Sequence, residues 1–189
     1  MRKAILAIAL AIAALFTVLS ATNASASTHP KPPANMPHGM KFITYYVFEA
    51  SDLNADLFGC VDDPNNGGSG TKLQYWSCNG RIQQQYYLAQ YADDPTGVYR
   101  IVGENGLCVD DTNGGGNGTH VQVYTCADGY HNQRWRLGYY GSVNYWRSDP
   151  VSGNPAIDLT NDSHTNGNPI QMWNWLQDNA QMWYGPFLG

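Results

Sequence analysis

The chain has 189 residues, with 10 Lys and Arg against 15 Asp and Glu, and its formal net charge is −5 at pH 7. Nucleic acids and anionic membranes demand clustered positive charge, which this acidic chain lacks, so we predict neither as a partner. Charged and aromatic residues each make up 13% of the chain, and Asn-Gly and Gly-Gly pairs recur. This composition predicts a turn-rich, all-β protein.

Residues 1–26 have the pattern of a secretory signal peptide. Two basic residues precede an apolar run from Ala4 to Leu19, and Ala24-Ser25-Ala26 supplies small residues two apart. The run is too short and wrongly flanked for a membrane anchor, and no later segment is apolar over about 18 residues. We therefore predict a secreted, extracellular protein whose mature chain begins at Ser27.

The next stretch, residues 27–41, is rich in proline and predicts a flexible lead-in. Residues 42–48 are apolar and aromatic and predict the first strand. The folded domain is expected to span residues 42–189.

One pattern occurs three times in this domain. Cys60-Val61-Asp62-Asp63 returns as Cys108-Val109-Asp110-Asp111, and the same shift of 48 positions (108 − 60) then leads to Ala156-Ile157-Asp158. Each copy continues with a Gly/Asn-rich loop, a short strand and Gln-x-aromatic. The predicted strands are 73–78, 121–126 and 170–175, and the aromatic residues are Tyr86, Trp135 and Trp183. Units this small must share a core, so we predict three similar β-units, about 42–94, 95–140 and 141–189.

The four cysteines fit an exported protein. The first two copies hold two cysteines each at the same places, and the third copy has lost both together. Paired loss favours a bond within each of the first two repeats, Cys60–Cys78 and Cys108–Cys126. Bonds between repeats are the alternative.

The short strands direct a Gln and a large aromatic residue away from the core. Alternate residues of a strand face opposite ways, so Gln122 and Tyr124 lie opposite Val121 and Val123. The other two strands alternate in the same way. An exposed ring packs on the apolar C–H face of a pyranose, while an amide and a nearby carboxylate bond its hydroxyls. The pattern therefore favours a sugar site in each repeat.

Together, Cys-x-Asp, Gln-x-aromatic-x-Cys and Asn-Gln-x-Trp resemble the motifs of ricin-type β-trefoil lectins, also called family 13 carbohydrate-binding modules. The resemblance covers roughly residues 42–187, and its threefold repetition makes it specific. It implies an all-β β-trefoil, a short barrel capped by three hairpins. It also implies a lectin, with no cofactor, for galactose-type glycans or plant polysaccharide side chains such as xylan and arabinan. We predict a monomer.

Carried over by position, the resemblance implies one carboxylate, one strand amide and one ring per sugar site. These are Asp62, Gln74 and Trp76 in the first repeat, Asp110, Gln122 and Tyr124 in the second, and Asp158, Gln171 and Trp173 in the third. The Asn before Gln-x-Trp is Asn132 in the second repeat, where the first has Gln83 and the third has Ala180. The second site is thus the most complete. The remaining candidates, Gln84, Gln133 and Gln181, either contact sugar or hold the Asp in place.

Other functions are less favoured by the sequence. Gln74 and Gln122 stand where an EF-hand loop beginning at Asp63 or Asp111 would need Glu, and the histidines lack zinc-ligand spacing, so no metal is predicted. A glycosidase needs one pair of carboxylates, whereas a threefold motif favours binding, so no catalytic residue is predicted. A secreted inhibitor or toxin-like trefoil that binds a protein is the alternative function.

Overall fold

The computed structural model describes residues 32–46, 48–50, 59–140, 143–148 and 155–184. The predicted signal peptide lies outside these residues. Within them the regular structure consists of strands and short 3-10 helices, and the strands join into one 14-stranded sheet. No helix in this part of the chain is long and apolar enough to cross a membrane.

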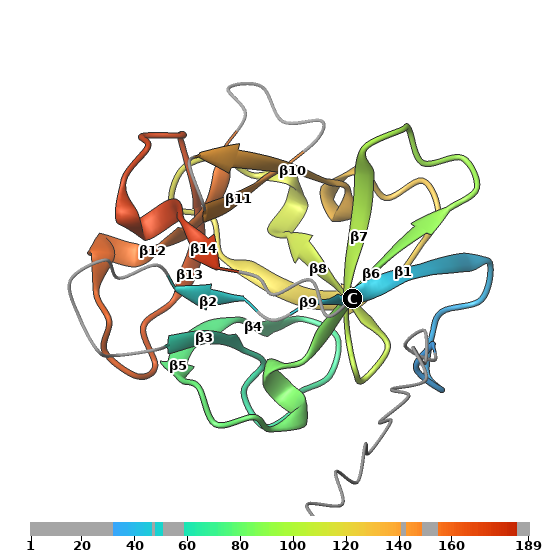
Figure 1. Ribbon diagram of the computed structural model, residues 1–189, viewed down its shortest axis with the longest axis horizontal. Helices are drawn as coiled ribbons and strands as arrows, with labels where there is room; N and C mark the ends of the chain where they lie inside the picture. The colour runs from blue at the N-terminus through green and yellow to red at the C-terminus, as the bar shows by residue number, and fades with distance from the viewer. Residues whose placement is uncertain (1–31, 47, 51–58, 141–142, 149–154, 185–189) are drawn as a thin grey trace, which may run out of the picture.

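One group of strands wraps around a common axis (Figure 1). Their antiparallel pairing runs in the order β1–β6–β7–β10–β11–β14–β2. The strands are β1 (Met40–Tyr46), β2 (Glu49–Ala50), β6 (Tyr86–Tyr91), β7 (Val98–Gly103), β10 (Trp135–Tyr140), β11 (Val143–Ser148) and β14 (Trp183–Tyr184). The first strand begins two residues before its predicted start at Phe42, because Met40 is buried in a cluster with Tyr87 and Ala89.

Three hairpins, one per repeat, complete the β-trefoil (Figure 1). They are β3 (Gly59–Asp62) with β5 (Gln74–Ser77), β8 (Leu107–Asp111) with β9 (Val121–Thr125), and β12 (Ala156–Leu159) with β13 (Ile170–Trp173). β4 (Thr71–Lys72) pairs with β9 of the next hairpin. The 3-10 helices are η1 (Ile82–Gln84), η2 (Thr112–Gly114), η3 (His131–Gln133), η4 (Thr160–Asp162) and η5 (Asn179–Gln181).

Backbone hydrogen bonds join the hairpins into a closed ring. The N–H of Gly70 donates to the Val123 carbonyl (2.7 Å), that of Gly118 to Met172 (2.9 Å) and that of Gly167 to Tyr75 (2.8 Å). The three glycines have φ values of 93°, 82° and 88°, in the left-handed region that favours glycine. The loop of each repeat therefore pairs with the strand of another, and the third returns to the first.

The aromatic residues of the three Gln-x-aromatic motifs lie in the core. Tyr86, Trp135 and Trp183 are all buried. The indole N–H of Trp135 donates to the Val109 carbonyl (3.0 Å), and that of Trp183 donates to Ile157 (3.2 Å). The Tyr86 hydroxyl, in contrast, is buried without a hydrogen-bond partner.

Both predicted disulfides, Cys60–Cys78 and Cys108–Cys126, are present. The hairpin strands end before these second cysteines, so β5 and β9 are shorter than predicted. The third repeat has no disulfide at this place. There the Trp175 ring packs on Tyr145, with the two ring centroids 4.0 Å apart.

The contrast between the first two repeats predicts opposite responses to losing a polar group. Trp135→Phe removes a buried indole donor and deprives the Val109 carbonyl of this partner, so it should destabilise the protein by more than about 1 kcal/mol. Tyr86→Phe removes a hydroxyl that has no partner and should stabilise by about 1 kcal/mol. Urea unfolding of both variants measures the difference, and a loss of stability in Tyr86→Phe would contradict it.

Candidate functional site

Each hairpin places an Asp directly opposite a Gln. The registers pair Asp62 with Gln74, Asp110 with Gln122, and Asp158 with Gln171. In each pair the Gln amide donates to one carboxylate oxygen, over 3.0, 2.9 and 2.7 Å respectively. The sequence predicted that these side chains act together, and the structure brings them into contact in all three repeats.

A second, buried Gln follows each hairpin. Gln84 and Gln133 donate to the remaining oxygen of Asp62 and Asp110, each over 3.1 Å, whereas the Gln181 amide donates to the backbone carbonyls of Trp173 (3.4 Å) and Asn174 (2.8 Å). Each of these glutamines also accepts an N–H from the loop after the hairpin, from Asn79, Ala127 and Leu176 respectively.

This placement corrects one part of the sequence prediction. Gln84, Gln133 and Gln181 have at most 1% of their surface exposed, so they offer no atoms to a ligand at the surface. Gln84 and Gln133 position the Asp and the loop instead, and Gln181 positions the loop. The alternative role considered from the sequence therefore matches the structure better than direct sugar contact.

Burial shapes the charge of the clamped carboxylates. It raises the pKa of Asp110, while hydrogen bonds from Gln122 and Gln133 partly offset it. Burial likewise raises the pKa of Asp158 to about 6, with further contributions from the negative charges of Asp178 and Asp162. Asp158 therefore takes up a proton in mild acid.

The predicted aromatic residues lie at the surface to nearly the same extent. Trp76, Tyr124 and Trp173 are 38%, 39% and 36% exposed. Each lines an open cavity together with the Asp and strand Gln of its own hairpin. We call these cavities site 1 (Asp62, Gln74, Trp76; about 370 Å³), site 2 (Asp110, Gln122, Tyr124; about 410 Å³) and site 3 (Asp158, Gln171, Trp173; about 310 Å³).

The sites differ at the position that the sequence marked as variable. In site 2 the Asn132 amide donates to the carboxylate of Asp110, and Asn132 lines the cavity. Gln83 lines site 1 and Ala180 lines site 3. Among the described residues, site 2 is thus the site in which the residue at this position bonds the carboxylate, whereas site 1 has the larger set of lining donors, with Asn65, Gln74, Asn79, Arg81 and Gln83.

Two further sets of lining residues were not found from the sequence. Asn65, Asn113 and Asn161 line sites 1, 2 and 3 and have φ values of 61°, 58° and 55°. Their spacing of 48 positions (65, 113 and 161) was the signal that could have revealed them. The other set, which differs in chemistry between repeats, is Arg81, Tyr130 and Asp178.

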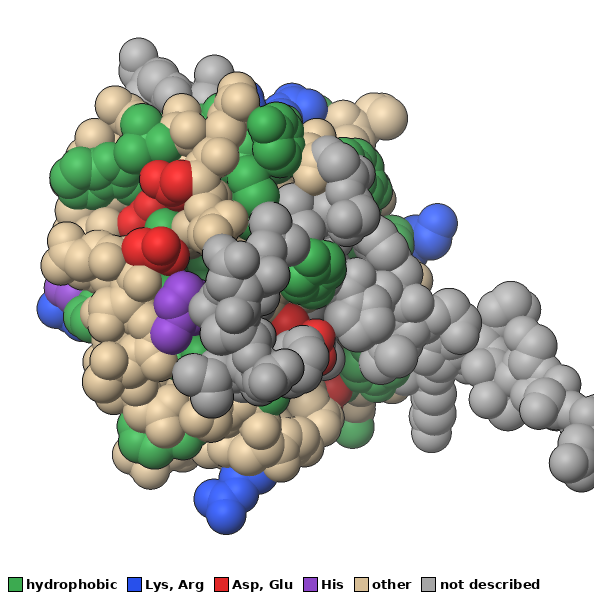
Figure 2. Space-filling model, turned by 60° about the vertical axis from the view of Figure 1, so that its left-hand side comes forward, with side chains coloured by type: hydrophobic (Ala, Val, Ile, Leu, Met, Phe, Trp, Pro, Cys, Tyr) green, Lys and Arg blue, Asp and Glu red, His purple; other side chains and the backbone are tan. Residues whose placement is uncertain are grey.

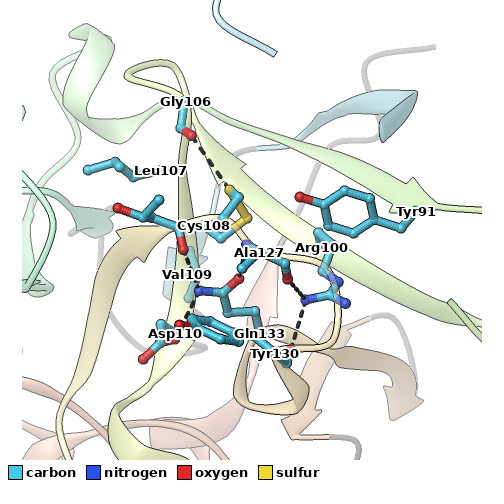
Figure 3. The surroundings of a disulfide bond; sticks show 12 residues. Tyr91, Arg100, Gly106, Leu107, Cys108, Val109, Asp110, Ala127, Tyr130 and Gln133 are labelled. Atoms are coloured by element: carbon cyan, nitrogen blue, oxygen red, sulfur yellow. Dashed lines mark hydrogen bonds between the residues drawn. A yellow bond between two sulfur atoms is a disulfide. The ribbon is translucent and has the colours of Figure 1, made fainter. Parts of the chain in front are cut away.

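A buried arginine, Arg100, holds one wall of site 2 (Figure 3). Arg100 is fully buried and pairs with Asp94 over 2.8 Å. Its guanidinium also donates to the carbonyls of Ala127 (3.4 Å) and Tyr130 (2.8 Å). The loop that carries the exposed Tyr130 ring is thereby anchored beside the Cys108–Cys126 disulfide.

One potential metal-ligand group occurs among the residues that the structure describes. Donor atoms of Glu49, Cys60 and Cys78 lie within 4.8 Å of one another. The two sulfurs are joined in a disulfide and supply no thiolate, so this group does not fit a metal centre.

The fold is a β-trefoil with one candidate site in each repeat. The family model for the ricin-type beta-trefoil lectin domain matches residues 53–183, and the chain therefore belongs to this family of carbohydrate-binding lectin domains. No curated protein matches the chain.

Solved structures share the fold at low sequence identity. The designed threefold symmetric protein ThreeFoil is 24% identical, with a TM-score of 0.65 over 75% of this chain and 96% of its own. The Rhizoctonia solani agglutinin is 14% identical, with a TM-score of 0.63 over 77% and 96%. An exo-beta-1,3-galactanase from Clostridium thermocellum is 24% identical, with a TM-score of 0.64 over 75% of this chain but only 30% of the galactanase.

The clamp geometry predicts which glutamine matters for folding. Gln133→Leu leaves the Ala127 N–H, the Thr125 carbonyl and one Asp110 oxygen without this partner inside the protein, so it should destabilise by about 2–4 kcal/mol. The matched control Gln122→Leu affects one hydrogen bond at a half-buried position and should cost about 1 kcal/mol. Chemical denaturation compares the two, and equal losses would contradict the proposed clamp.

Proposed function

We propose that this protein is a secreted lectin that binds sugars at sites 1, 2 and 3 without transforming them. The observation that carries the proposal is the threefold occurrence of one exposed ring beside one clamped carboxylate and one amide in an open cavity. Galactose-type glycans or side chains of plant polysaccharides are the proposed ligands. The two disulfides fit an oxidising, extracellular compartment.

The site chemistry suits a pyranose. A flat ring such as Tyr124 covers the apolar C–H face of the sugar, and the adjacent carboxylate accepts from its hydroxyls with charge-assisted strength. A carboxylate has about four lone-pair positions, and the amides of Gln122, Gln133 and Asn132 occupy three on Asp110. These donors leave the carboxylate fixed and still able to accept from a ligand.

The described linings of sites 1 and 2 favour binding over hydrolysis. Each contains a single carboxylate, Asp62 or Asp110, whereas glycoside hydrolysis uses a pair across the scissile bond. Three sites on one rigid monomer would raise the effective concentration for a branched or polymeric glycan, so weak individual sites suffice.

A screen of glycans and polysaccharides tests this function with matched ring variants. Tyr124→Ala should weaken site 2 by about tenfold because the stacking surface is lost. Its stability should change by no more than about 0.5 kcal/mol because the ring is exposed. The triple variant Trp76→Ala/Tyr124→Ala/Trp173→Ala should lose glycan binding altogether while remaining folded.

Two results would argue against the lectin. One is binding that survives in the folded triple variant. The other is a wild-type protein that binds no glycan but captures a protein partner, which would indicate a protein-directed trefoil.

The raised pKa of Asp158 predicts a pH dependence of site 3. Its pKa of about 6 means that the carboxylate becomes protonated as pH falls from 7 to 5, so its acceptor strength and the affinity of site 3 should decline over this range. The protonated form is favoured in the folded state, so this group's contribution to stability is lost as pH rises through about 6. Titration of a Trp76→Ala/Tyr124→Ala variant, with NMR detection of the Asp158 carboxyl, measures both. A carboxyl that titrates near 4 would refute the prediction.

A further inference from the structure

One position in each repeat gives the three sites different charges. Arg81, Tyr130 and Asp178 each immediately precede a 3-10 helix, η1, η3 and η5, and each lies three residues before the buried clamp glutamine. Each also lines the cavity of its own repeat. We call this the wall position. It is cationic in site 1, neutral and aromatic in site 2, and anionic in site 3.

The backbone at the wall position of site 1 is firmly held. The Arg81 N–H donates to the Asn79 side-chain oxygen (2.9 Å), and its carbonyl accepts from the Gln84 N–H (3.0 Å). The clamp glutamine Gln84 in turn accepts the Asn79 N–H (2.8 Å). The Arg81 residue itself is exposed, and the ion pairs found among the described residues involve Arg100 and Arg134 instead. A positive charge thus stands at the cavity edge on a fixed backbone.

Site 3 has the opposite character. Asp158, Asp162 and Asp178 all line this cavity. Burial raises the pKa of Asp178, and the nearby negative charge of Asp162 raises it further. Figure 2 turns the side where β12 and β13 lie toward the viewer and shows acidic side chains gathered on this face. A ligand with its own negative charge would be repelled there.

We propose that the wall position selects sugars by charge, and that Arg81 makes site 1 the binding site for acidic sugars. The ligand class is a pyranose with a carboxylate, such as a uronic acid, whose ring packs on Trp76 while its carboxylate meets the Arg81 guanidinium. This inference rests on the proposed lectin function and adds the ligand class of one site. Guanidinium and carboxylate match in charge and in planar, two-point hydrogen bonding. Acidic sugars therefore bind at site 1 and are rejected at site 3, so one molecule distinguishes charged from neutral branches of a mixed glycan.

The test uses full chains in which one site remains. Trp173→Ala/Tyr124→Ala keeps site 1, and Trp76→Ala/Tyr124→Ala keeps site 3. Calorimetric titration uses two matched pairs that differ only at C6, methyl galactoside against methyl galactosiduronate and methyl glucoside against methyl glucosiduronate. Site 1 should prefer the acid about five- to tenfold, as for a partly exposed charge pair with hydrogen bonding. Site 3 should prefer the neutral sugar.

Exchanging the wall residues provides the decisive comparison. Arg81→Tyr, which installs the residue of site 2, should abolish the acid preference of site 1, and Arg81→Asp should reverse it. Asp178→Tyr should reduce the discrimination against acids at site 3. Raising NaCl from about 0.05 M to about 0.5 M should shrink the site-1 preference, because salt screens the pair.

The outcomes distinguish failure of charge selection by Arg81 from failure of the proposed lectin function. If site 1 binds sugars with an acid-to-neutral ratio that Arg81→Tyr leaves unchanged, or if only the other two sites bind, charge selection by Arg81 is wrong and the lectin stands. If none of the three sites binds any sugar of a wider glycan panel, the proposed function itself fails.

Discussion

The closed ring of bonds between repeats is the constraint on which the rest of the structure depends. Three glycine N–H groups, one in each loop, donate hydrogen bonds to a strand of another repeat. Side chains reinforce this ring at equivalent places, where Ser69, Asn117 and Asn166 accept the N–H groups of Thr125, Asn174 and Ser77. No hairpin has its full set of partners until all three are present. Each sugar site is therefore built on a hairpin that the other two repeats hold in place.

The buried glutamine clamp then links this frame to the site chemistry. Gln133 is bonded to the Asp110 carboxylate, to the strand carbonyl of Thr125 and to the loop N–H of Ala127. One amide thus fixes the acceptor for the ligand and the start of the loop that carries the wall residue. Burial supplies the rigidity, since a buried amide with every group paired has no favourable alternative position. The same burial raises the pKa of the carboxylate, so precise placement and sensitivity to acid have one physical origin.

The fold and most residues of each site could be predicted from the sequence because the same motif recurs in each repeat. The alternation around Val121 and Val123 identified the outward Gln122 and Tyr124, and paired loss of cysteines identified both disulfides. Closure of the β-trefoil followed from the family resemblance, because local patterns do not specify how three units meet. The wall position was missed because Arg81, Tyr130 and Asp178 share no chemistry. Their equivalence appears only in the geometry before each 3-10 helix.

The third repeat shows which features of the site are kept when the disulfide is absent. It has lost the disulfide, and Trp175 instead stacks on Tyr145 while the Arg147 guanidinium lies 4.7 Å from the Tyr145 ring and 5.4 Å from that of Trp175. Yet Gln181 still accepts the Leu176 N–H, and Gln171 still donates to Asp158. A covalent link can be replaced by packing because either restrains the loop. Gln181 stays buried and still bonds the loop, although its amide donates to the Trp173 and Asn174 carbonyls rather than to Asp158. The retained elements are therefore the Gln171–Asp158 pair and the bond from the loop to the buried glutamine, whereas the wall residue changes from repeat to repeat.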